Sequence, residues 1–472
     1  MKNRRFLSVF FLSILVLVTI LSPFAAAEET EEESGPVVMP TIDIPSKASL
    51  LIDPETEEIL HQENIHERLY PASLTKIMST LLVLEAVDSG KLTMDQKITA
   101  TASALDPVPD NASTADLKVG ETLTVQDLLY CVMVVSANEA CNILAEAVSG
   151  SIDAFVEAMN AKAQALGCED THFVNTSGLH DDDHYTTAWD MYLITKAAMA
   201  NEAFMPIADT AYFTLPATYA ADGTQYHKER TLYTTNLLLS PYRGRGYVYS
   251  AAQGIKTGTT TPAGNCLISL AVKDDRSLLG VILGASVVTD EEGNSDNQSF
   301  SGMIDLFDWG FDSFSRKTIL TTKSFMGEVQ VSLSEIDHVV VQPARDVERL
   351  LPKDLDVEDL TLTEYYPNEV VEAPVSKGDV LGQLTVSYGD VEYATVELLA
   401  QDDVAASRLL VFRRDVTEFV SRRDVQIGAI AVVAVILVIL ILVKTSGRRR
   451  RRYGRGGGYG GYRRNYRGRK RR

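Results

Sequence analysis

The sequence has few cysteines, and their spacing excludes the common cysteine-based sites. Only four occur in 472 residues, and no two have the two-residue separation typical of zinc and redox motifs. Their surroundings are apolar or mixed, which favours buried free thiols, although one bridge between two of them stays open. No metal and no cofactor is predicted. The four are Cys131, Cys141, Cys168 and Cys266.

Basic residues are scarce outside the C-terminal end. Residues 444–472 hold 14 of the 44 Lys and Arg and no acidic residue, which leaves 30 basic against 64 acidic residues elsewhere, a balance near −34. So acidic a body argues against binding to nucleic acid. In the tail, 445–472, Arg, Gly and Tyr are interleaved as in disordered RNA-binding segments. The simpler interpretation is a stop-transfer flank with affinity for anionic lipid.

Long apolar runs occur only near the two ends. A positive start, an apolar run and Ala25–Ala27 predict a cleaved signal peptide over 1–27 rather than an uncleaved anchor. Residues 427–443 have no charge and no polar stripe, so we expect a transmembrane helix over 425–444 rather than a core or interfacial helix. The basic flank predicts a single-pass cell-membrane protein with a cytoplasmic tail and an extracellular body.

The body between these ends is long enough for two domains. After an acidic linker, 28–36, the pattern over 37–315 places strands at the beginning and end with helices between. This predicts a sheet packed against a helical cluster. Over 316–410, short strands alternate with turns, which predicts a small β-sandwich. It offers no nucleophile–base pair, so we expect a spacer or docking role. A linker, 411–424, leads to the span.

Apolar periodicity gives the main elements of the first domain. Asp274-Asp275-Arg276 is predicted to be a hairpin turn, and Gly90 to end the first helix. The expected strands are 49–53, 266–273 and 277–285, and the expected helical regions are 73–89, 125–148, 152–166 and 304–314.

The first motif that carries chemistry is Ser73-Leu74-Thr75-Lys76, at the start of a predicted helix. Residues three apart share a helix face, so the hydroxyl and the amine point the same way. A serine becomes a nucleophile when a neighbour takes its proton. A lysine takes it when burial and nearby cations disfavour the charged amine. Taken alone, the motif is explained as well by an N-cap serine beside a surface lysine.

A second motif, Ser136-Ala137-Asn138, interrupts an otherwise apolar helical stretch. Burying such groups without partners costs about 1–3 kcal/mol each, which indicates that the pair lines a cleft. There Ser136 would relay a proton to a leaving amine, and Asn138 would hold Lys76 and a substrate amide. A short loop between two helices explains the same residues when they are taken alone.

The third motif is Lys256-Thr257-Gly258, followed by Thr259. Small residues on a strand allow an extended substrate backbone to lie alongside. Lys256 would attract a substrate carboxylate and lower the proton affinity of Lys76, and Thr257 would hydrogen-bond that carboxylate. A polar edge strand with a turn glycine is the ordinary alternative.

Together, and in this order, the three motifs match the set shared by penicillin-binding proteins and class A β-lactamases. The chain resembles low-molecular-weight penicillin-binding proteins of the D-alanyl-D-alanine carboxypeptidase type from about residue 37 to 314, and more loosely beyond. That resemblance implies an α/β (α+β) β-lactamase/transpeptidase-like domain, a small β-domain and one C-terminal membrane helix. It is carried by Pro71–Lys76, Asn175–Leu179, His184–Ala188, Gly254–Gly258 and Ala263–Leu267.

The resemblance implies an acyl-enzyme reaction in cell wall biogenesis. The terminal D-alanine of peptidoglycan stem pentapeptides would be released through an ester on Ser73, and β-lactams would acylate the same residue. Backbone N–H groups of Ser73 and Thr259 would form the oxyanion hole. No cofactor is implied. The residues expected to act are Ser73, Lys76 and Ser136 in catalysis and Asn138, Lys256, Thr257, Gly258 and Thr259 in substrate binding.

Two positions depart from the family's pattern. Relatives often carry Arg just after the strand that ends here at Ala285, where this chain has Ser286-Val287. Some also carry Arg before the asparagine that corresponds to Asn236, where this chain has Thr235. Recognition of the carboxylate would therefore rest on Lys256 and Thr257 alone.

Three alternatives use the same motifs. A class A β-lactamase would need a Glu-x-x-Leu-Asn pattern between Ser136 and Lys256, and none is present. A non-catalytic wall-binding protein is disfavoured because every motif residue is intact. An endopeptidase that cuts peptide cross-links remains open.

Overall fold

A computed structural model describes residues 39–220, 222–243 and 246–450. Its contacts divide the chain into two compact units. The first runs to Ser315 and includes Leu350–Leu355; the second comprises Arg316–Arg349 and the chain from Asp356 onward. The predicted signal peptide and acidic linker, and most of the basic tail, lie outside the described residues.

The first unit is built on a five-stranded antiparallel sheet in the order β2-β1-β11-β10-β9. The predicted hairpin is confirmed: Asp274 and Asp275 have φ of 52° and 57°, as a two-residue hairpin turn of this hand requires. The outer strand, β9, leaves one edge unpaired by any strand of this sheet. The five strands are β1 Ala48–Asp53, β2 Glu58–Glu63, β9 Ala252–Thr260, β10 Gly264–Lys273 and β11 Arg276–Ala285.

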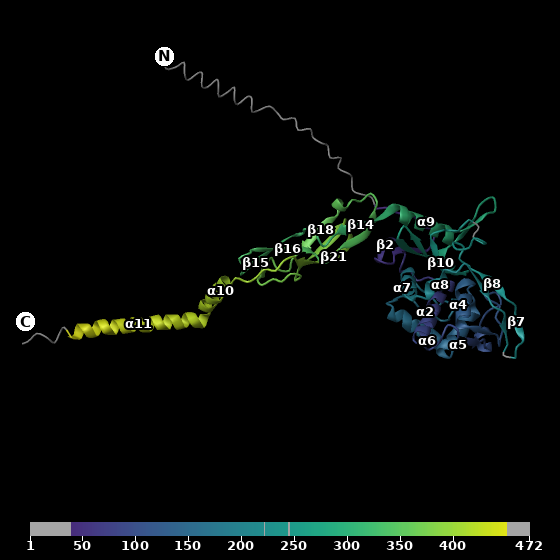
Figure 1. The fold of residues 1–472 in the computed structure, drawn as a ribbon, viewed down its shortest axis with the longest axis horizontal. Coiled ribbons are helices and arrows are strands. Elements are labelled where there is room, and N and C mark those ends of the chain that lie inside the picture. Colours follow the sequence, from purple (N-terminus) through teal and green to yellow (C-terminus); the bar gives the residue numbers. More distant parts are fainter. Residues whose placement is uncertain (1–38, 221, 244–245, 451–472) are drawn as a thin grey trace, which may run out of the picture. The chain divides into compact units, whose positions relative to one another are not determined.

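Both faces of the sheet are covered, because buried apolar residues alternate along its strands. Leu50 and Ile52 belong to the larger apolar cluster, with the helices, whereas Leu51 between them belongs to the cluster under α9, Gln298–Ser313. Figure 1 shows α9 on one side of the strands and the other helices gathered opposite. The packing is close at Gly310 of α9, where a Cβ would lie 2.6 Å from a Leu51 methyl carbon.

The helical cluster brings the first two motifs onto neighbouring elements. The predicted helical region 125–148 is two helices, broken where Ser136 adopts φ of 61°. The helices are η1 Ala72–Thr75, α2 Lys76–Asp88, α3 Ala102–Leu105, α4 Val125–Val134, α5 Asn138–Ser149, α6 Ile152–Ala165, α7 Ala188–Met199 and α8 Phe204–Ala208. Short strand pairs lie between and after them: β3 Lys97–Thr99 with β4 Thr122–Thr124, β5 Tyr212–Leu215 with β8 Arg230–Tyr233, β6 Thr218–Tyr219 with β7 Gln225–His227, and β12 Val287–Thr289 with β13 Ser295–Asn297.

The second unit is all-β up to its last strand, as the sequence predicts. Six of its strands form one sheet in the order β18-β20-β21-β16-β15-β19, in which only β15 and β19 are parallel. The six strands are β15 Gly327–Ser332, β16 His338–Pro343, β18 Thr361–Tyr365, β19 Val370–Glu372, β20 Val380–Tyr388 and β21 Val391–Ala400. A short 3-10 helix, η2 Val357–Asp359, precedes β18. β14 Phe314–Leu320 pairs with β17 Val347–Pro352.

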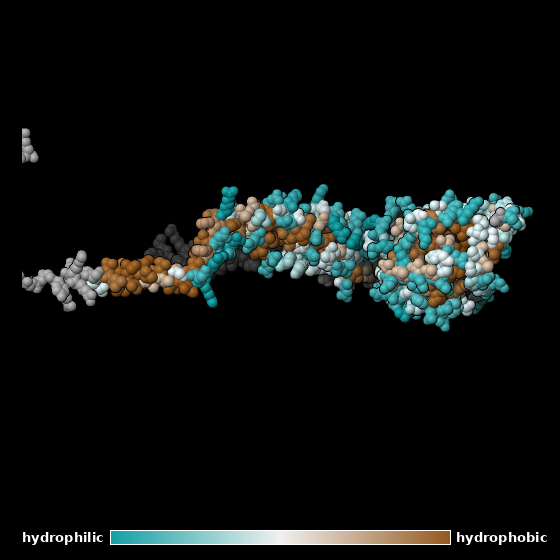
Figure 2. Space-filling view, turned by 90° about the horizontal axis from the view of Figure 1, so that it is seen from below, coloured by the Kyte–Doolittle hydropathy of each residue, from teal (hydrophilic) through white to brown (hydrophobic). Residues whose placement is uncertain are grey.

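Two helices follow the sheet. α11, Arg423–Arg450, contains the one segment of the described chain that is long and apolar enough to cross a membrane, Arg423–Thr445. Figure 2 shows this helix as an almost unbroken apolar surface. The segment predicted to be a linker, 411–424, is largely helical, because α10 spans Arg408–Ser421. Its exposed apolar residues recur at helical spacing, at Leu409, Phe412, Val416, Phe419 and Val420.

Candidate active site

Ser73 and Lys76 lie together where the first helix of the cluster begins. Ser73 is in η1 and Lys76 is the first residue of α2, so one turn separates them, as the motif predicts. The Lys76 amine lies 3.0 Å from the Ser73 hydroxyl oxygen. Ala72, just before the serine, has φ of 47°, a conformation that non-glycine residues rarely adopt and that is common at functional sites.

The Lys76 side chain is fully buried and surrounded by oxygen atoms. Besides Ser73 Oγ, its Nζ contacts Asn138 Oδ1 at 2.6 Å and the Ser177 carbonyl at 2.7 Å. Burial lowers the pKa of Lys76 to about 8, against the opposing influence of Cys141 and Glu139. A substantial fraction of the amine is therefore neutral near physiological pH.

These three contacts fix the direction of the neutral amine. It has two N–H groups and one lone pair, and the Ser177 carbonyl and the Asn138 side-chain oxygen can only accept hydrogen bonds. Both N–H groups are therefore directed at those oxygens. The lone pair is left for Ser73, whose hydroxyl can donate. The arrangement makes Lys76 a hydrogen-bond acceptor for the serine proton.

Lys256 places a second lysine beside the site, on the neighbouring strand, β9. Its side chain is 1% exposed, and its Nζ donates to the Thr257 carbonyl at 2.9 Å. Burial, and next the charge of Lys76, hold the pKa of Lys256 well below its usual value. Because two buried ammonium groups repel each other, protonation of one lysine makes protonation of the other less favourable.

Gly258 brings β9 against the reactive turn. A Cβ at this position would lie 2.8 Å from the Pro71 carbonyl and 3.0 Å from the Ser73 amide nitrogen, so only glycine permits this approach. Thr259 follows on the same strand, its side chain exposed and 3.2 Å from Asn265 Oδ1. Because β9 is the outer strand of its sheet, the edge beside Ser73 is open to an extended peptide.

The second motif forms the turn between α4 and α5. Asn138 begins α5, and its amide donates to the Ser113 carbonyl at 2.9 Å. Ser136 is 4% exposed and stands two residues earlier. This turn is tied to β9 through Thr235, whose amide donates to the Val134 carbonyl and whose hydroxyl lies 2.6 Å from that of Thr257. The sequence-predicted residues of all three motifs therefore gather around one place.

Ser177 was missed as a site residue by reasoning on the sequence, although its segment was noted. The Asn175 side-chain oxygen accepts from the amides of Ser177 and Gly178 at 3.2 and 2.7 Å, which shapes the turn that presents the Ser177 carbonyl to Lys76. A Cβ on Gly178 would lie 1.7 Å from the Ala72 carbonyl oxygen. Any residue type has a backbone carbonyl, so the sequence cannot show that this one binds Lys76. Only Gly178 indicated that the backbone is closely packed here.

A second chain of contacts supports the strained turn before the serine. His184 Nδ1 accepts from the Val174 amide at 3.3 Å, and its Nε2 lies 2.8 Å from the Thr75 hydroxyl, which donates to the Ala72 carbonyl at 2.9 Å. Burial lowers the pKa of His184 to about 4, so the ring is neutral. The neutral ring with Nδ1 accepting carries its hydrogen on Nε2, as this chain of donors requires.

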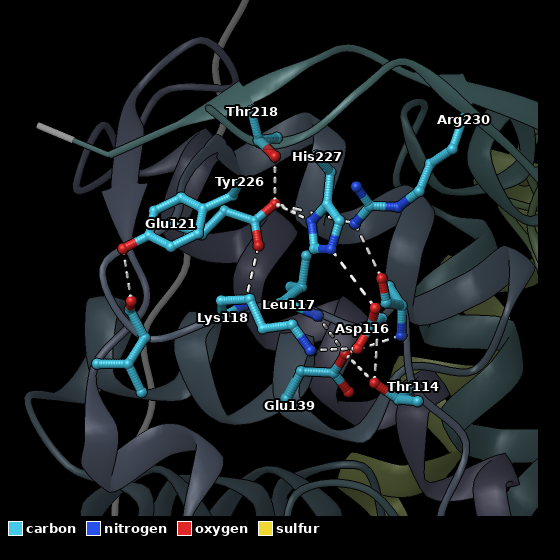
Figure 3. A network of polar contacts seen from close by, with 12 residues as sticks. Thr114, Asp116, Leu117, Lys118, Glu121, Glu139, Thr218, Tyr226, His227 and Arg230 are labelled. Atoms are coloured by element: carbon cyan, nitrogen blue, oxygen red, sulfur yellow. Dashed lines mark hydrogen bonds and ion pairs between the residues drawn. The ribbon is translucent and has the colours of Figure 1, made fainter. Parts of the chain in front are cut away.

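The loop that contacts Asn138 through the Ser113 carbonyl is held by a polar network around Glu121 and Glu139, which Figure 3 shows. The fully buried Glu121 accepts from the Lys118 amide at 2.8 Å and from the Thr218 hydroxyl, and lies 3.2 Å from His227 Nδ1. Glu139, next to Asn138, accepts from the Ala115 amide at 2.7 Å. Both carboxylates therefore hold the loop whose Ser113 carbonyl positions Asn138.

Within the described residues, no cluster of three or more His, Cys, Asp or Glu side chains has the arrangement of a metal site. The site brings together a serine hydroxyl, an adjacent buried amine and a second buried lysine. Such a set can carry out acyl transfer to serine.

Comparisons with known proteins agree with this chemistry. Residues 32–287 match the family model of D-alanyl-D-alanine carboxypeptidase, and residues 314–406 match that of the penicillin-binding protein 5 C-terminal domain. The D-alanyl-D-alanine carboxypeptidase DacF of Bacillus subtilis is 28% identical over 409 residues, 87% of this chain and 97% of that protein. The D-alanyl-D-alanine carboxypeptidase DacC of Escherichia coli is 31% identical over 375 residues, 76% of this chain and 82% of that protein.

A solved structure shows the same architecture. Penicillin binding protein 5 from Haemophilus influenzae has a TM-score of 0.61 at 26% identity, and the match covers 78% of this chain and 100% of that one. The likeness therefore extends through both units.

Proposed function

Because this chain belongs to the D-alanyl-D-alanine carboxypeptidase family of penicillin-binding proteins, we propose that it removes the terminal D-alanine of peptidoglycan stems through an ester on Ser73. The single observation that carries this assignment is the set of oxygens around Lys76. They direct the lone pair of the neutral amine at the serine hydroxyl.

In the first step the Ser73 proton moves to Lys76 as Oγ bonds to the carbonyl carbon between the two D-alanines. The carbonyl oxygen becomes an oxyanion, held by the backbone N–H groups of Ser73 and Thr259. The close approach of Gly258 to the Ser73 amide, with Thr259 next on the same strand, supports this pair of donors. The C–N bond then breaks, and the leaving D-alanine amine takes a proton from Lys76, relayed by Ser136. Water, deprotonated by Lys76, hydrolyses the ester and restores Ser73.

Substrate binding is assigned to the edge of β9. Lys256 attracts the terminal carboxylate and the Thr257 hydroxyl hydrogen-bonds it, while Asn138 holds the substrate amide beside Lys76. The Thr235 hydroxyl, which stands where some relatives carry Arg, contacts Thr257 and orients its hydroxyl. This chain thus replaces a cation at that position by a neutral hydrogen-bonding group.

The test is Ser73→Ala in the otherwise intact chain. It should abolish both labelling by fluorescent penicillin and release of D-alanine from stem pentapeptide, detected by mass spectrometry. The matched control is Ser89→Ala, at the exposed opposite end of α2, which should retain both activities. D-alanine release that persists in Ser73→Ala would exclude this mechanism.

The fate of the penicillin adduct separates the hydrolases of this fold. A long-lived adduct on Ser73 supports the carboxypeptidase, whereas rapid turnover of penicillin would support a β-lactamase. A cross-linked dimeric peptide offered beside the pentapeptide tests the endopeptidase: cleavage between the two stems, without release of D-alanine, would favour it.

The C-terminal helix is proposed to anchor the enzyme with its active unit outside the cell membrane and its basic tail in the cytoplasm. The apolar surface of α11 and the basic residues after it support this orientation. In spheroplasts treated with protease, the body should be digested while an epitope added at the C-terminus stays protected. An epitope that is digested with the body would reverse the topology.

The all-β unit is proposed to hold the catalytic unit away from the membrane, because it lies between that unit and the span in the sequence. Deleting it while keeping the span should impair action on intact cell wall more than on soluble pentapeptide. Equal losses on both substrates would count against a spacer role.

A further inference from the structure

Three tyrosine residues form an exposed cluster on the first unit, which we call the tyrosine cluster. Tyr212 on β5 and Tyr233 on β8 stand directly opposite each other in their strand pair, and Tyr242 follows in the loop after β8. The centre of the Tyr242 ring lies 6.1 Å from that of Tyr212 and 5.8 Å from that of Tyr233. In chain order the three residues are 53%, 40% and 68% exposed. Exposed apolar groups that gather in one place mark binding surfaces more often than exposed groups scattered singly.

The other face of the same strand pair is packed, so the exposure of the cluster belongs to the fold. Phe213, next to Tyr212, stacks on the Tyr130 ring of α4 at 4.0 Å, and Leu232, next to Tyr233, is buried. Successive side chains of a strand point to opposite faces, which turns the tyrosines to solvent. None of the residues that the structure describes forms a hydrogen bond with the three tyrosine hydroxyls. The cluster therefore offers ring faces and unbonded hydroxyls to a ligand.

The strands that carry the cluster are tied to the end of β9 where the substrate carboxylate is assigned. Thr235, two residues after β8, has its hydroxyl 2.6 Å from that of Thr257. Asp209, three residues before β5, accepts from the Gly254 amide at 2.9 Å. The carbonyl that is attacked is assigned to Thr259, further along β9 in the other direction. The cluster therefore lies beyond the carboxyl end of the bound stem.

The covalent structure of the cell wall indicates what lies at that end. A stem is joined to its own glycan strand by its amino end, so its carboxyl end points away from that strand and toward a neighbouring one. A pyranose ring has a face of C–H groups that packs on the negative face of an aromatic ring, and its acetamido and hydroxyl groups bond with a phenol. Tyrosine provides this contact at a small cost in conformational entropy. The saccharide of a neighbouring strand thus matches both the place and the chemistry of the cluster.

Arg243 adds a cation beside the cluster. It is exposed and adjacent to Tyr242, and its amide donates to the Ser240 hydroxyl at 3.1 Å. Its guanidinium forms no ion pair with any residue of the described chain. Outside residues 444–472 the chain carries 30 basic and 64 acidic residues, so its surface as a whole repels an anionic polymer. A local guanidinium offsets this repulsion and binds a carboxylate of a neighbouring stem.

We propose that the tyrosine cluster and Arg243 bind the glycan strand that neighbours the one whose stem is trimmed. Pyranose rings stack on Tyr212 and Tyr242, and their acetamido groups bond with the tyrosine hydroxyls. The enzyme then acts faster on stems that end beside a second strand than on free peptides. The inference rests on the proposed function, because that function sets the direction of the bound stem.

The first test measures binding of the linear tetramer of β-1,4-linked N-acetylglucosamine to the full chain in detergent, by titration calorimetry. Replacing both Tyr212 and Tyr242 by Ala should raise Kd about tenfold or more, because two stacking contacts are lost. Replacing both by Phe keeps the rings and should raise Kd by less than about threefold. Arg243→Gln should leave Kd for this neutral saccharide unchanged. The matched control is Tyr365→Ala, an exposed tyrosine of β18 in the second unit, which should also leave it unchanged.

Two results of this titration would overturn the proposal. One is the absence of binding by the unaltered chain, and the other is an unchanged Kd when both tyrosines are replaced by Ala. Sedimentation of the same variants tests the other occupant, a second copy of this chain. Self-association that is lost on replacing the two tyrosines, with saccharide binding unchanged, would assign the cluster to a protein interface instead.

The second test compares release of D-alanine from intact cell wall with release from soluble pentapeptide. Replacing Tyr212 and Tyr242 by Ala should lower the rate on cell wall about threefold to tenfold and leave kcat/KM for the soluble peptide unchanged. Arg243→Gln should lower only the rate on cell wall, by a smaller factor, since an exposed charge pair contributes little. Equal losses on both substrates would overturn the proposal, because they would show damage to the site itself. If the unaltered enzyme released no D-alanine from either substrate, the proposed function would fall, whereas the titration would still decide whether the cluster binds saccharide.

Discussion

The two units differ in what they bury. Every buried polar or charged side chain among the described residues lies in the first unit, between Ser49 and Ser299. Apart from the hydroxyl of Tyr393, the buried side chains of the second unit are apolar, for example Val341, Leu384 and Leu398. Burying a charge is unfavourable unless it is paired and hydrogen-bonded. The first unit therefore tolerates a less favourable interior, and that interior lies where the proposed reaction takes place.

This difference in buried side chains indicates that the chemistry belongs to the first unit. Lys76 and Lys256 are buried amines without a carboxylate bonded to either, and hydrogen-bond acceptors satisfy them instead. The second unit holds no comparable group within the part of it that the structure describes. Substitutions in the first unit should therefore separate activity from stability, and those in the second should change stability alone.

The largest effect should come from Lys76→Met, which keeps the length of the side chain and removes the base. Acylation of Ser73 by fluorescent penicillin should slow by about 10³-fold, within the range for loss of a general base. The matched control is Lys196→Met, which removes a surface lysine paired with Glu57 and should acylate normally. An acylation rate within tenfold of the unaltered enzyme would show that another group takes the serine proton.

In the second unit, Leu384→Ala should lower the free energy of unfolding by about 3 kcal/mol, because it leaves a cavity in the apolar interior of β20. Chemical denaturation measures this loss. Gln383→Ala, exposed on the same strand, should change it by less than about 0.5 kcal/mol. The acylation rate of the folded protein should be the same in both variants. A slower rate in Leu384→Ala would show that packing in the second unit affects the reaction in the first.

The pH dependence of acylation should follow Lys76, whose pKa burial lowers to about 8. Only the neutral amine accepts the proton, so the rate should rise about tenfold per pH unit below pH 8 and level off above it. Stopped-flow labelling between pH 6 and 9 measures this. A rate that stays constant over this range would contradict the assignment of the base.

The same pKa has a consequence for stability. Between about pH 8 and the usual lysine value of 10.5, the unfolded chain binds more protons at Lys76 than the folded chain does. The contribution of this group to the free energy of unfolding should therefore rise with pH across that window. A Lys76→Met variant lacks the contribution, and its free energy of unfolding should rise less over the same window.

The smallest effect concerns Thr235. Thr235→Val removes the hydroxyl that lies 2.6 Å from that of Thr257 and keeps the shape of the side chain. Because one hydrogen bond contributes about 1 kcal/mol, kcat/KM for the pentapeptide should fall about fivefold. Thr214→Val, on the nearby strand β5, is the control and should leave it unchanged. No change in Thr235→Val would remove Thr235 from carboxylate recognition.

Sequence patterns predicted the parts of the site that depend on local spacing. Ser73 and Lys76 are one turn apart, and Lys256 to Thr259 follow one strand, so periodicity alone relates their side chains. The contacts between motifs join residues far apart in the chain: Lys76 meets Asn138 and Ser177 after 62 and 101 residues. The chemistry of each motif suggested that Asn138 and Lys256 lie near Lys76, and the family resemblance joined the three motifs into one site, but nothing in residue type marked the Ser177 carbonyl.

The segment before the span has a helix that the sequence analysis did not predict. Residues 411–424 were predicted to be a linker, and α10 covers most of them. Its apolar residues recur every three or four positions, from Leu409 through Phe412 and Val416 to Phe419, which is a helical period. The signal was present in the sequence, but the charged residues between these positions obscured it.

The four cysteines have a consequence for the redox chemistry of the folded protein. All are unpaired, and burial raises the pKa of Cys141 and Cys266 to about 11 and that of Cys168 to about 12, and raises that of Cys131 further. Disulfide exchange requires the thiolate, which at neutral pH is then a minute fraction of each thiol. Once folded, the body therefore presents almost no reactive thiolate, and its structure depends on no disulfide among these four cysteines.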